Sequence, residues 1–207
     1  MVKLLKCSRF VFLPRMRIVL IIVFTLFGKN LIAQKPMLVS SSKHADFTNR
    51  NIVTTLNGRP ISFYLNHLQI DSYSKMFFKG KLSISSNSIT NGIIDSVLTK
   101  NPETRPFYFF LFNQIVDLSD ETMVDLVANR CVDFVEKYPC DFFNSFNQPD
   151  ININVVKWTT YMGQALKDRN KYVDFKNVVD CNLKGCCFGV QDLWKSFFVE
   201  VRMCLVQ

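Results

Sequence analysis

The chain has 207 residues, of which 48% are hydrophobic, 14% aromatic and 20% charged. An intrinsically disordered protein is excluded because such chains lack the apolar surface that offsets the entropy lost on folding, and seven Gly and seven Pro exclude collagen-like architectures. The net charge of +8 suggests a nucleic-acid or membrane-surface partner. However, six of the 25 Lys and Arg residues precede residue 34, which leaves 19 bases against 17 acids and gives no reason to expect nucleic-acid binding.

The first 33 residues have the pattern of a secretion signal. A basic region ends at Arg17, an apolar run follows over residues 18–27, and the small residue Ala33 precedes the expected cut at Ala33–Gln34. The apolar run matches the roughly 7–15 residues of a signal-peptide core and is shorter than the about 20 residues of a membrane span. We therefore expect residues 1–33 to be a cleaved signal peptide and the protein to be secreted or periplasmic in a bacterium, with membrane contact only through this signal. An uncleaved signal anchor is the alternative.

Residues 34–58 are polar and without a sustained period, and we expect them to form a mobile N-terminal segment before a helical domain of residues 59–207. The start of that domain is ambiguous. The spacing of Ile61, Leu65 and Leu68 fits a short helix, whereas Lys81–Ser85 alternates like a strand.

Helical patterns dominate from residue 88 onward, where Ser88 or Thr90 is the expected first cap. Apolar residues at helical spacing occur in the ranges 93–98, 107–112, 123–135, 141–146, 151–166, 172–179 and 190–204. The run Phe107–Phe112 is apolar on every side and is the predicted centre of the core. The sequence thus predicts an all-α protein, a compact bundle of about six or seven helices with short connections.

Six cysteines follow the expected leader: Cys131, Cys140, Cys181, Cys186, Cys187 and Cys204. An even number in an exported protein favours structural disulfides. We expect Cys131 to pair with Cys140, and Cys181 to pair with Cys186 or Cys187. Buried free thiols remain an alternative, as does a metal or redox site, although the C-x₄-C-C spacing fits neither a zinc site nor a C-x-x-C redox centre.

The sequence contains no catalytic motif that we recognise, and we predict no cofactor and no metal site. It has no G-x-S-x-G, H-E-x-x-H, phosphate-binding glycine loop or EF-hand pattern. His44 and His67 are the only histidines; we expect His44 to be solvated and His67 to be half-exposed. The stretch Lys75–Lys81 alternates bases with aromatics, as in platforms that stack bases, but a solvated turn with Met76 and Phe77 tucked inward is the preferred interpretation.

Four acids crowd the start of one predicted helix: Asp117, Asp120, Glu121 and Asp125. Two of them could form the acid/base pair of a glycan hydrolase, or a calcium site. The first turn of a helix, however, favours acids by its dipole alone.

The leading functional hypothesis is an exported, disulfide-braced helical protein of non-enzymatic type that binds another protein or serves in the cell envelope. The alternative is a secreted hydrolase that uses carboxylates near Asp117–Asp125. A signal-anchored membrane protein is a third hypothesis.

Overall fold

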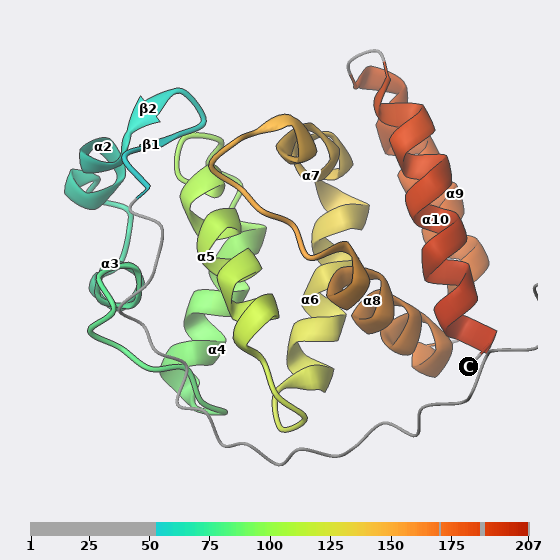
Figure 1. Ribbon diagram of the computed structural model, residues 1–207, viewed down its shortest axis with the longest axis horizontal. Coiled ribbons are helices and arrows are strands. Elements are labelled where there is room, and N and C mark those ends of the chain that lie inside the picture. Colours follow the sequence, from blue (N-terminus) through green and yellow to red (C-terminus); the bar gives the residue numbers. More distant parts are fainter. Residues whose placement is uncertain (1–52, 170, 187–188, 207) are drawn as a thin grey trace, which may run out of the picture. The chain divides into compact units, whose positions relative to one another are not determined.

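The computed structural model describes residues 53–169, 171–186 and 189–206 (Figure 1), which all belong to the unit His44–Gln207. Several predictions concern residues outside these ranges. They are the signal peptide 1–33, the mobile segment up to residue 52 with His44, and any disulfide through Cys187.

A short β-hairpin begins the described part of the chain. Strands β1 (Thr55–Leu56) and β2 (Arg59–Pro60) pair antiparallel. Between them, Asn57 and Gly58 have φ angles of 51° and 72°, the left-handed conformation that an Asn-Gly hairpin turn requires. Residues 53–58 fall inside the segment expected to be mobile, yet here they form the first strand and the turn, and Leu56 is fully buried.

Two short helices occupy the first half of the ambiguous stretch, α2 (Ile61–Asn66) and α3 (Ser72–Phe78). Asp71 caps α3 because its carboxylate accepts a hydrogen bond from Ser74 N at 2.8 Å. Because α3 extends to Phe78, most of the expected turn at Lys75–Lys81 is the last turn of this helix.

The strand expected from the alternation of Lys81–Ser85 does not form. This segment has no regular secondary structure, and among the described residues the two hairpin strands pair only with each other. Leu82 and Ile84 are partly buried and pack against the core. The alternation therefore reflects an extended segment that lies on the core without joining a sheet.

Helix α4 (Ser88–Asp95) continues into the 3-10 turn η2 (Ser96–Leu98). Its cap is Asn87, one residue before the first expected cap, and the Asn87 side chain accepts a hydrogen bond from Thr90 N at 2.9 Å. Helix α5 (Arg105–Leu118) follows, and all of its residues from Phe107 to Phe112 are buried. The predicted centre of the core is thus confirmed.

The later helices agree with the apolar ranges predicted from the sequence. They are α6 (Val124–Lys137), α7 (Pro139–Asn144) with η3 (Ser145–Asn147), α8 (Val155–Arg169), α9 (Tyr172–Asn182) with η4 (Leu183–Gly185), and α10 (Val190–Val206). The prediction of an all-α protein is confirmed for the described residues. These contain nine α-helices, more than the six or seven expected, because the ambiguous stretch supplies two short helices.

Helix α8 joins the two sides of the core, since it packs against both α6 and α10. Its Trp158 is fully buried, with ring centroids 4.7 Å from Phe142 and 5.5 Å from Phe112. The indole Nε1 donates a hydrogen bond to Asn113 Oδ1 at 2.9 Å, which satisfies its polar atom inside the core. Most of the phenylalanines of 107–146 fill this core, as expected.

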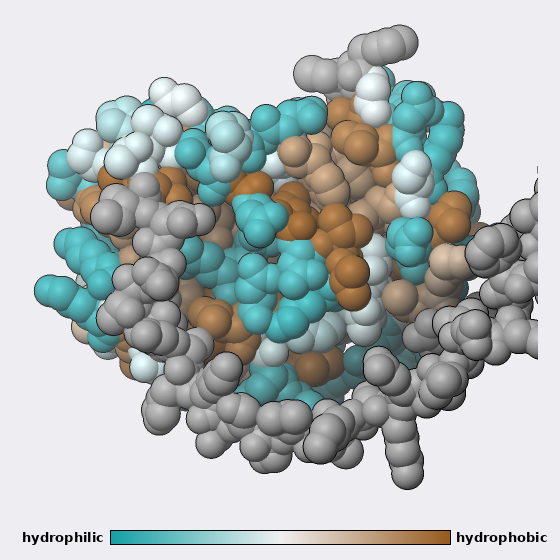
Figure 2. All heavy atoms as spheres, viewed as in Figure 1, coloured by the Kyte–Doolittle hydropathy of each residue, from teal (hydrophilic) through white to brown (hydrophobic). Residues whose placement is uncertain are grey.

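Hydrophobic residues also reach the surface. Leu68 is 99% exposed and Val156 is 74% exposed. On the face drawn in Figure 2, brown hydrophobic residues emerge in several separate places between teal hydrophilic ones. Among the described residues, no helix combines the length and the apolar character that crossing a bilayer requires.

Candidate binding pocket

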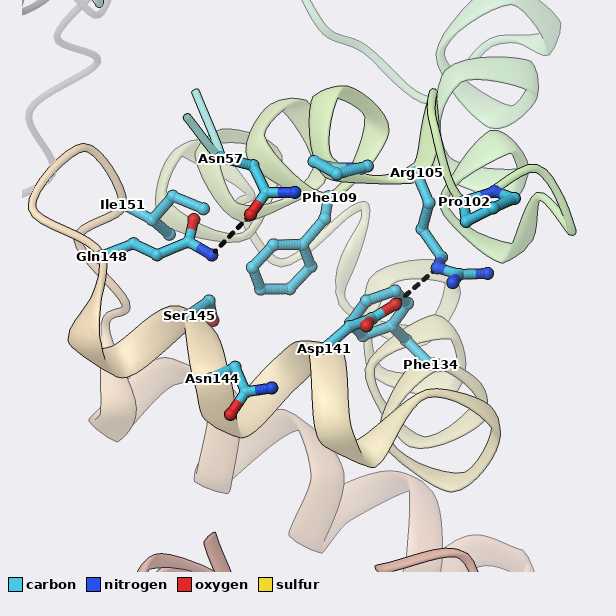
Figure 3. A pocket seen from close by; sticks show the side chains of 11 residues that line it. Asn57, Pro102, Arg105, Phe109, Phe134, Asp141, Asn144, Ser145, Gln148 and Ile151 are labelled. Carbon is cyan, nitrogen blue, oxygen red and sulfur yellow. Dashed lines mark hydrogen bonds and ion pairs between the residues drawn. The ribbon is translucent and has the colours of Figure 1, made fainter. Parts of the chain in front are cut away.

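A pocket of about 290 Å³ opens between the hairpin turn, the start of α5 and the helix α7 (Figure 3). Its size is close to the lower end of the range of ligand sites, roughly 300–1,000 Å³. The side chains that give the pocket its chemical character come from four segments: Asn57, Arg105, Phe109, Asp141, Asn144 and Gln148. The tertiary fold alone brings these segments together.

An ion pair forms one wall of the pocket. Arg105 lies in the first turn of α5, and its Nε donates to Asp141 Oδ2 at 2.5 Å. A second guanidinium nitrogen donates to the Thr99 carbonyl at 3.4 Å, and the guanidinium lies 3.9 Å from the centroid of the Tyr138 ring. Because Arg105 is only 15% exposed and its charge is matched by Asp141, this wall presents hydrogen-bonding groups without net charge.

Three carboxamides complete the polar part of the lining. Asn57 projects from the hairpin turn, Asn144 from the last turn of α7, and Gln148 from the residues after η3 (Figure 3). Gln148 Nε2 donates to Asn57 Oδ1 at 3.4 Å. Gln148 Oε1 is buried and has no hydrogen-bond partner among the described residues, so this acceptor is unsatisfied.

The ring of Phe109 points into the pocket between these polar groups (Figure 3). It stacks on Phe134 with a centroid separation of 4.8 Å, which fixes its orientation. The Ser145 hydroxyl donates to the Phe142 carbonyl at 2.5 Å and is therefore engaged. Among the lining residues, Asp141 is the only carboxylate, so this pocket holds no pair of acids.

The four acids singled out in the sequence all lie on the surface. Although Asp117 is exposed as a residue, partial burial of its carboxyl raises its pKa, opposed by a hydrogen bond with Asn154 and the charge of Lys157. Hydrogen bonds from the Thr122 hydroxyl and amide, at 2.7 and 3.0 Å, lower the pKa of Asp120.

The other two acids also stand apart. Gln164 Nε2 donates to Asp125 Oδ1 at 3.3 Å, and Glu121 is exposed. Asp117, Asp120 and Asp125 thus have different partners, and none of these contacts joins two of the acids.

The other candidates from the sequence do not lie in the pocket. His67 is partly exposed, as expected; its Nδ1 accepts a hydrogen bond from Gln69 N at 3.2 Å, and its Nε2 lies 3.9 Å from a carboxylate oxygen of Glu103. In the stretch Lys75–Lys81, Phe77 is buried, as expected, but Met76 is 39% exposed.

The cysteines pair differently from the expectation. Cys140 forms a disulfide with Cys186, with a Cα–Cα distance of 5.3 Å, while Cys131, Cys181 and Cys204 are free. The expected Cys131–Cys140 pair is wrong because Cys140 is bonded to Cys186, while Cys131 lies on the buried face of α6. Burial raises the pKa of the Cys131 thiol well above its ordinary value. The pairing of Cys181 with Cys186 is wrong as well, since Cys186 is bonded to Cys140 and Cys181 is free.

The pocket residues were not predicted from the sequence. The sequence singled out neither Arg105 nor Gln148, and Asn57 fell inside the polar segment 34–58. The Asn57-Gly58 pair is the one local signal that was available, because this dipeptide favours a two-residue hairpin turn.

No group of three or more potential metal ligands occurs within the described ranges. Comparisons with family models, with curated proteins and with solved structures gave no significant match. The functional inference therefore depends on the geometry of the chain itself.

Proposed function

We propose that this chain is an exported, non-enzymatic binding protein that engages another protein through the pocket of Figure 3. The observation that carries the proposal is the lining, in which three carboxamides and an internally neutralised Arg105–Asp141 pair surround the ring of Phe109. A carboxamide combines donor and acceptor groups in one plane, as a peptide group does. The pocket therefore suits a short uncharged segment of a partner, with the aromatic ring facing an apolar side chain.

Export is supported by two independent observations. The basic and then apolar pattern of residues 1–33 is typical of a secretion signal. The Cys140–Cys186 disulfide is of the kind that persists in oxidising compartments such as the periplasm.

The pocket is tested by capture of envelope and secreted proteins from the natural host on immobilised protein. Asn144→Ala removes a pocket amide, whereas Asn147→Ala removes an exposed amide of η3 and is the matched control. We expect one protein to be retained by the wild type and by Asn147→Ala, but about tenfold less by Asn144→Ala, as for the loss of a buried hydrogen bond. Equal retention by all three would contradict a role for the pocket.

Export is tested by N-terminal sequencing of the protein recovered from its natural host. Cleavage predicts a mature chain that begins at Gln34. A chain that still begins at Met1 and sediments with membranes would instead support the signal anchor.

The hydrolase alternative has one observation in its favour, the raised pKa of Asp117, which is a property of general acids. Its test is the hydrolysis of a panel of nitrophenyl glycosides by the wild type and by Asp117→Asn. Turnover that the substitution abolishes would replace the binding proposal by a catalytic one.

A further inference from the structure

A second cavity, of about 420 Å³, lies between α9 and α10, two helices that are adjacent in Figure 1. Large aromatic side chains hold them apart. Tyr172 stacks on Phe198 with centroids 4.8 Å apart, and Phe175 meets Trp194 edge-on at 5.9 Å. The space between the helices is the groove that we call the α9/α10 groove.

The floor of the α9/α10 groove is apolar. Leu183, Trp194 and Phe198 line it, and each is at most 9% exposed, so these side chains are held in place by the core behind them. An acyl chain that lies against this floor removes its own methylene groups from water, which favours binding.

The rim of the groove carries three lysines and one acid, Lys176, Lys184, Lys195 and Asp180. The acid is already neutralised, because Lys176 donates to its Oδ2 and the Trp194 indole donates to its Oδ1 at 2.6 Å. Partial burial opposes these two hydrogen bonds but does not outweigh them, and the pKa of Asp180 is lowered. The carboxylate therefore contributes little free negative charge to the rim.

The other two lysines are available to an anion. Lys195 pairs with Asp192 at 3.0 Å, but both side chains are largely exposed, so this pair is weak and easily exchanged. Lys184 is exposed and forms no hydrogen bond or ion pair with any described residue. The rim thus has unmatched positive charge directly above an aromatic floor.

We infer that the α9/α10 groove binds a ligand that has an acyl chain and a single anionic head group, with the chain on Trp194 and Phe198 and the head group at Lys184 and Lys195. A free fatty-acid anion is the simplest ligand with these two parts. The inference is independent of the pocket of Figure 3.

The test is titration of the full chain with decanoate below its micelle concentration, followed by calorimetry and by tryptophan emission. The chain has two Trp residues, and Trp158 is sealed in the core, so an emission change reports on Trp194. We expect saturable one-to-one binding. Hexanoate should bind at least tenfold more weakly, because four methylene groups are lost. Decyltrimethylammonium, with the same chain and the opposite charge, should not bind.

The residues of the rim are tested by charge removal. Lys184→Gln should weaken decanoate binding about three- to fivefold, the effect of one exposed ion pair, and the double variant with Lys195→Gln should weaken it further. Lys81→Gln is the matched control, since Lys81 is exposed and follows α3, which Figure 1 shows at the opposite edge of the helix array from α9 and α10. None of these exposed lysines contributes to the core, so folding is not at issue.

Three results would overturn the inference. One is the absence of decanoate binding, including the case in which the chain sediments with phosphatidylglycerol vesicles but ignores free decanoate. The second is equal affinity for decanoate and decyltrimethylammonium. The third is equal weakening by Lys184→Gln and Lys81→Gln.

Discussion

At Gly163, helix α8 comes close to α10. A Cβ at this position would lie 2.6 Å from Cys204 Cβ and 3.3 Å from the Val201 carbonyl oxygen, both on α10. We expect Gly163→Ala to reduce the free energy of unfolding by about 1–3 kcal/mol, because the helices must separate.

Gly92 is the control for this prediction, since it is also helical, lies in α4 and has nothing within 4 Å of an added Cβ. Gly92→Ala should stabilise the protein by about 0.5–1 kcal/mol through helix propensity. Urea unfolding of both variants measures the two effects. If both substitutions raised the free energy of unfolding, the close contact at Gly163 would not be what excludes a larger side chain.

Cys131 and Cys181 should differ sharply in reactivity. The Cys131 thiol is fully buried and burial raises its pKa, whereas Cys181 is exposed. Because the thiolate is the reactive form, iodoacetamide should modify Cys181 in the native protein and Cys131 only after unfolding. Peptide mass spectrometry of the labelled protein distinguishes the two sites, and early labelling of Cys131 would contradict the packing of α6.

At the scale of elements, the disulfide ties the start of α7 to the end of η4. Cys140 and Cys186 are 46 residues apart, and closing a loop of this length stabilises a protein by about 2–4 kcal/mol. We expect the double variant Cys140→Ser, Cys186→Ser to lose stability of this order in chemical unfolding, with Cys181→Ser as the control that loses almost none. Equal stability of the double variant and the wild type would show that helix packing alone positions η4.

At the scale of the whole molecule, Asp117 and Asp180 should change the free energy of unfolding in opposite directions as the pH rises. The pKa of Asp117 is raised, so ionisation disfavours the folded state, and this cost appears as the pH rises above 3.8. The pKa of Asp180 is lowered, so its contribution is present above the ordinary pKa and is lost as the pH falls through the folded value.

Asp117→Asn should therefore stabilise the protein at pH 7, and Asp180→Asn should destabilise it. The difference for Asp117→Asn should shrink in urea unfolding at pH 3, which lies below the ordinary Asp pKa of 3.8 and further below the raised pKa of Asp117. The difference for Asp180→Asn should shrink as the pH falls from the ordinary value toward the lowered folded-state pKa of Asp180. A difference for Asp117→Asn that is unchanged between the two pH values would mean that the effect does not come from ionisation.

Much of this fold could be predicted from the sequence, because periodicity and caps are local. The stripe on α6 and the apolar run Phe107–Phe112 indicated their helices directly. The stretch Lys81–Ser85 was ambiguous in the sequence because an extended segment on a core alternates as a strand does. The cysteine pairing failed because the choice between Cys131 and Cys186 depends on which way each helix faces. The binding pocket could not be predicted either, because Asn57 and Gln148 are far apart in the sequence and meet only in the tertiary fold.

The bond between Cys140 and Cys186 also has a topological consequence. Helices α8 and α9 lie between these two cysteines in the chain, so a protease that cuts once between the two helices divides the backbone without dividing the molecule. The nicked form would migrate as one species in a non-reducing gel and would release two fragments only when a reductant is added.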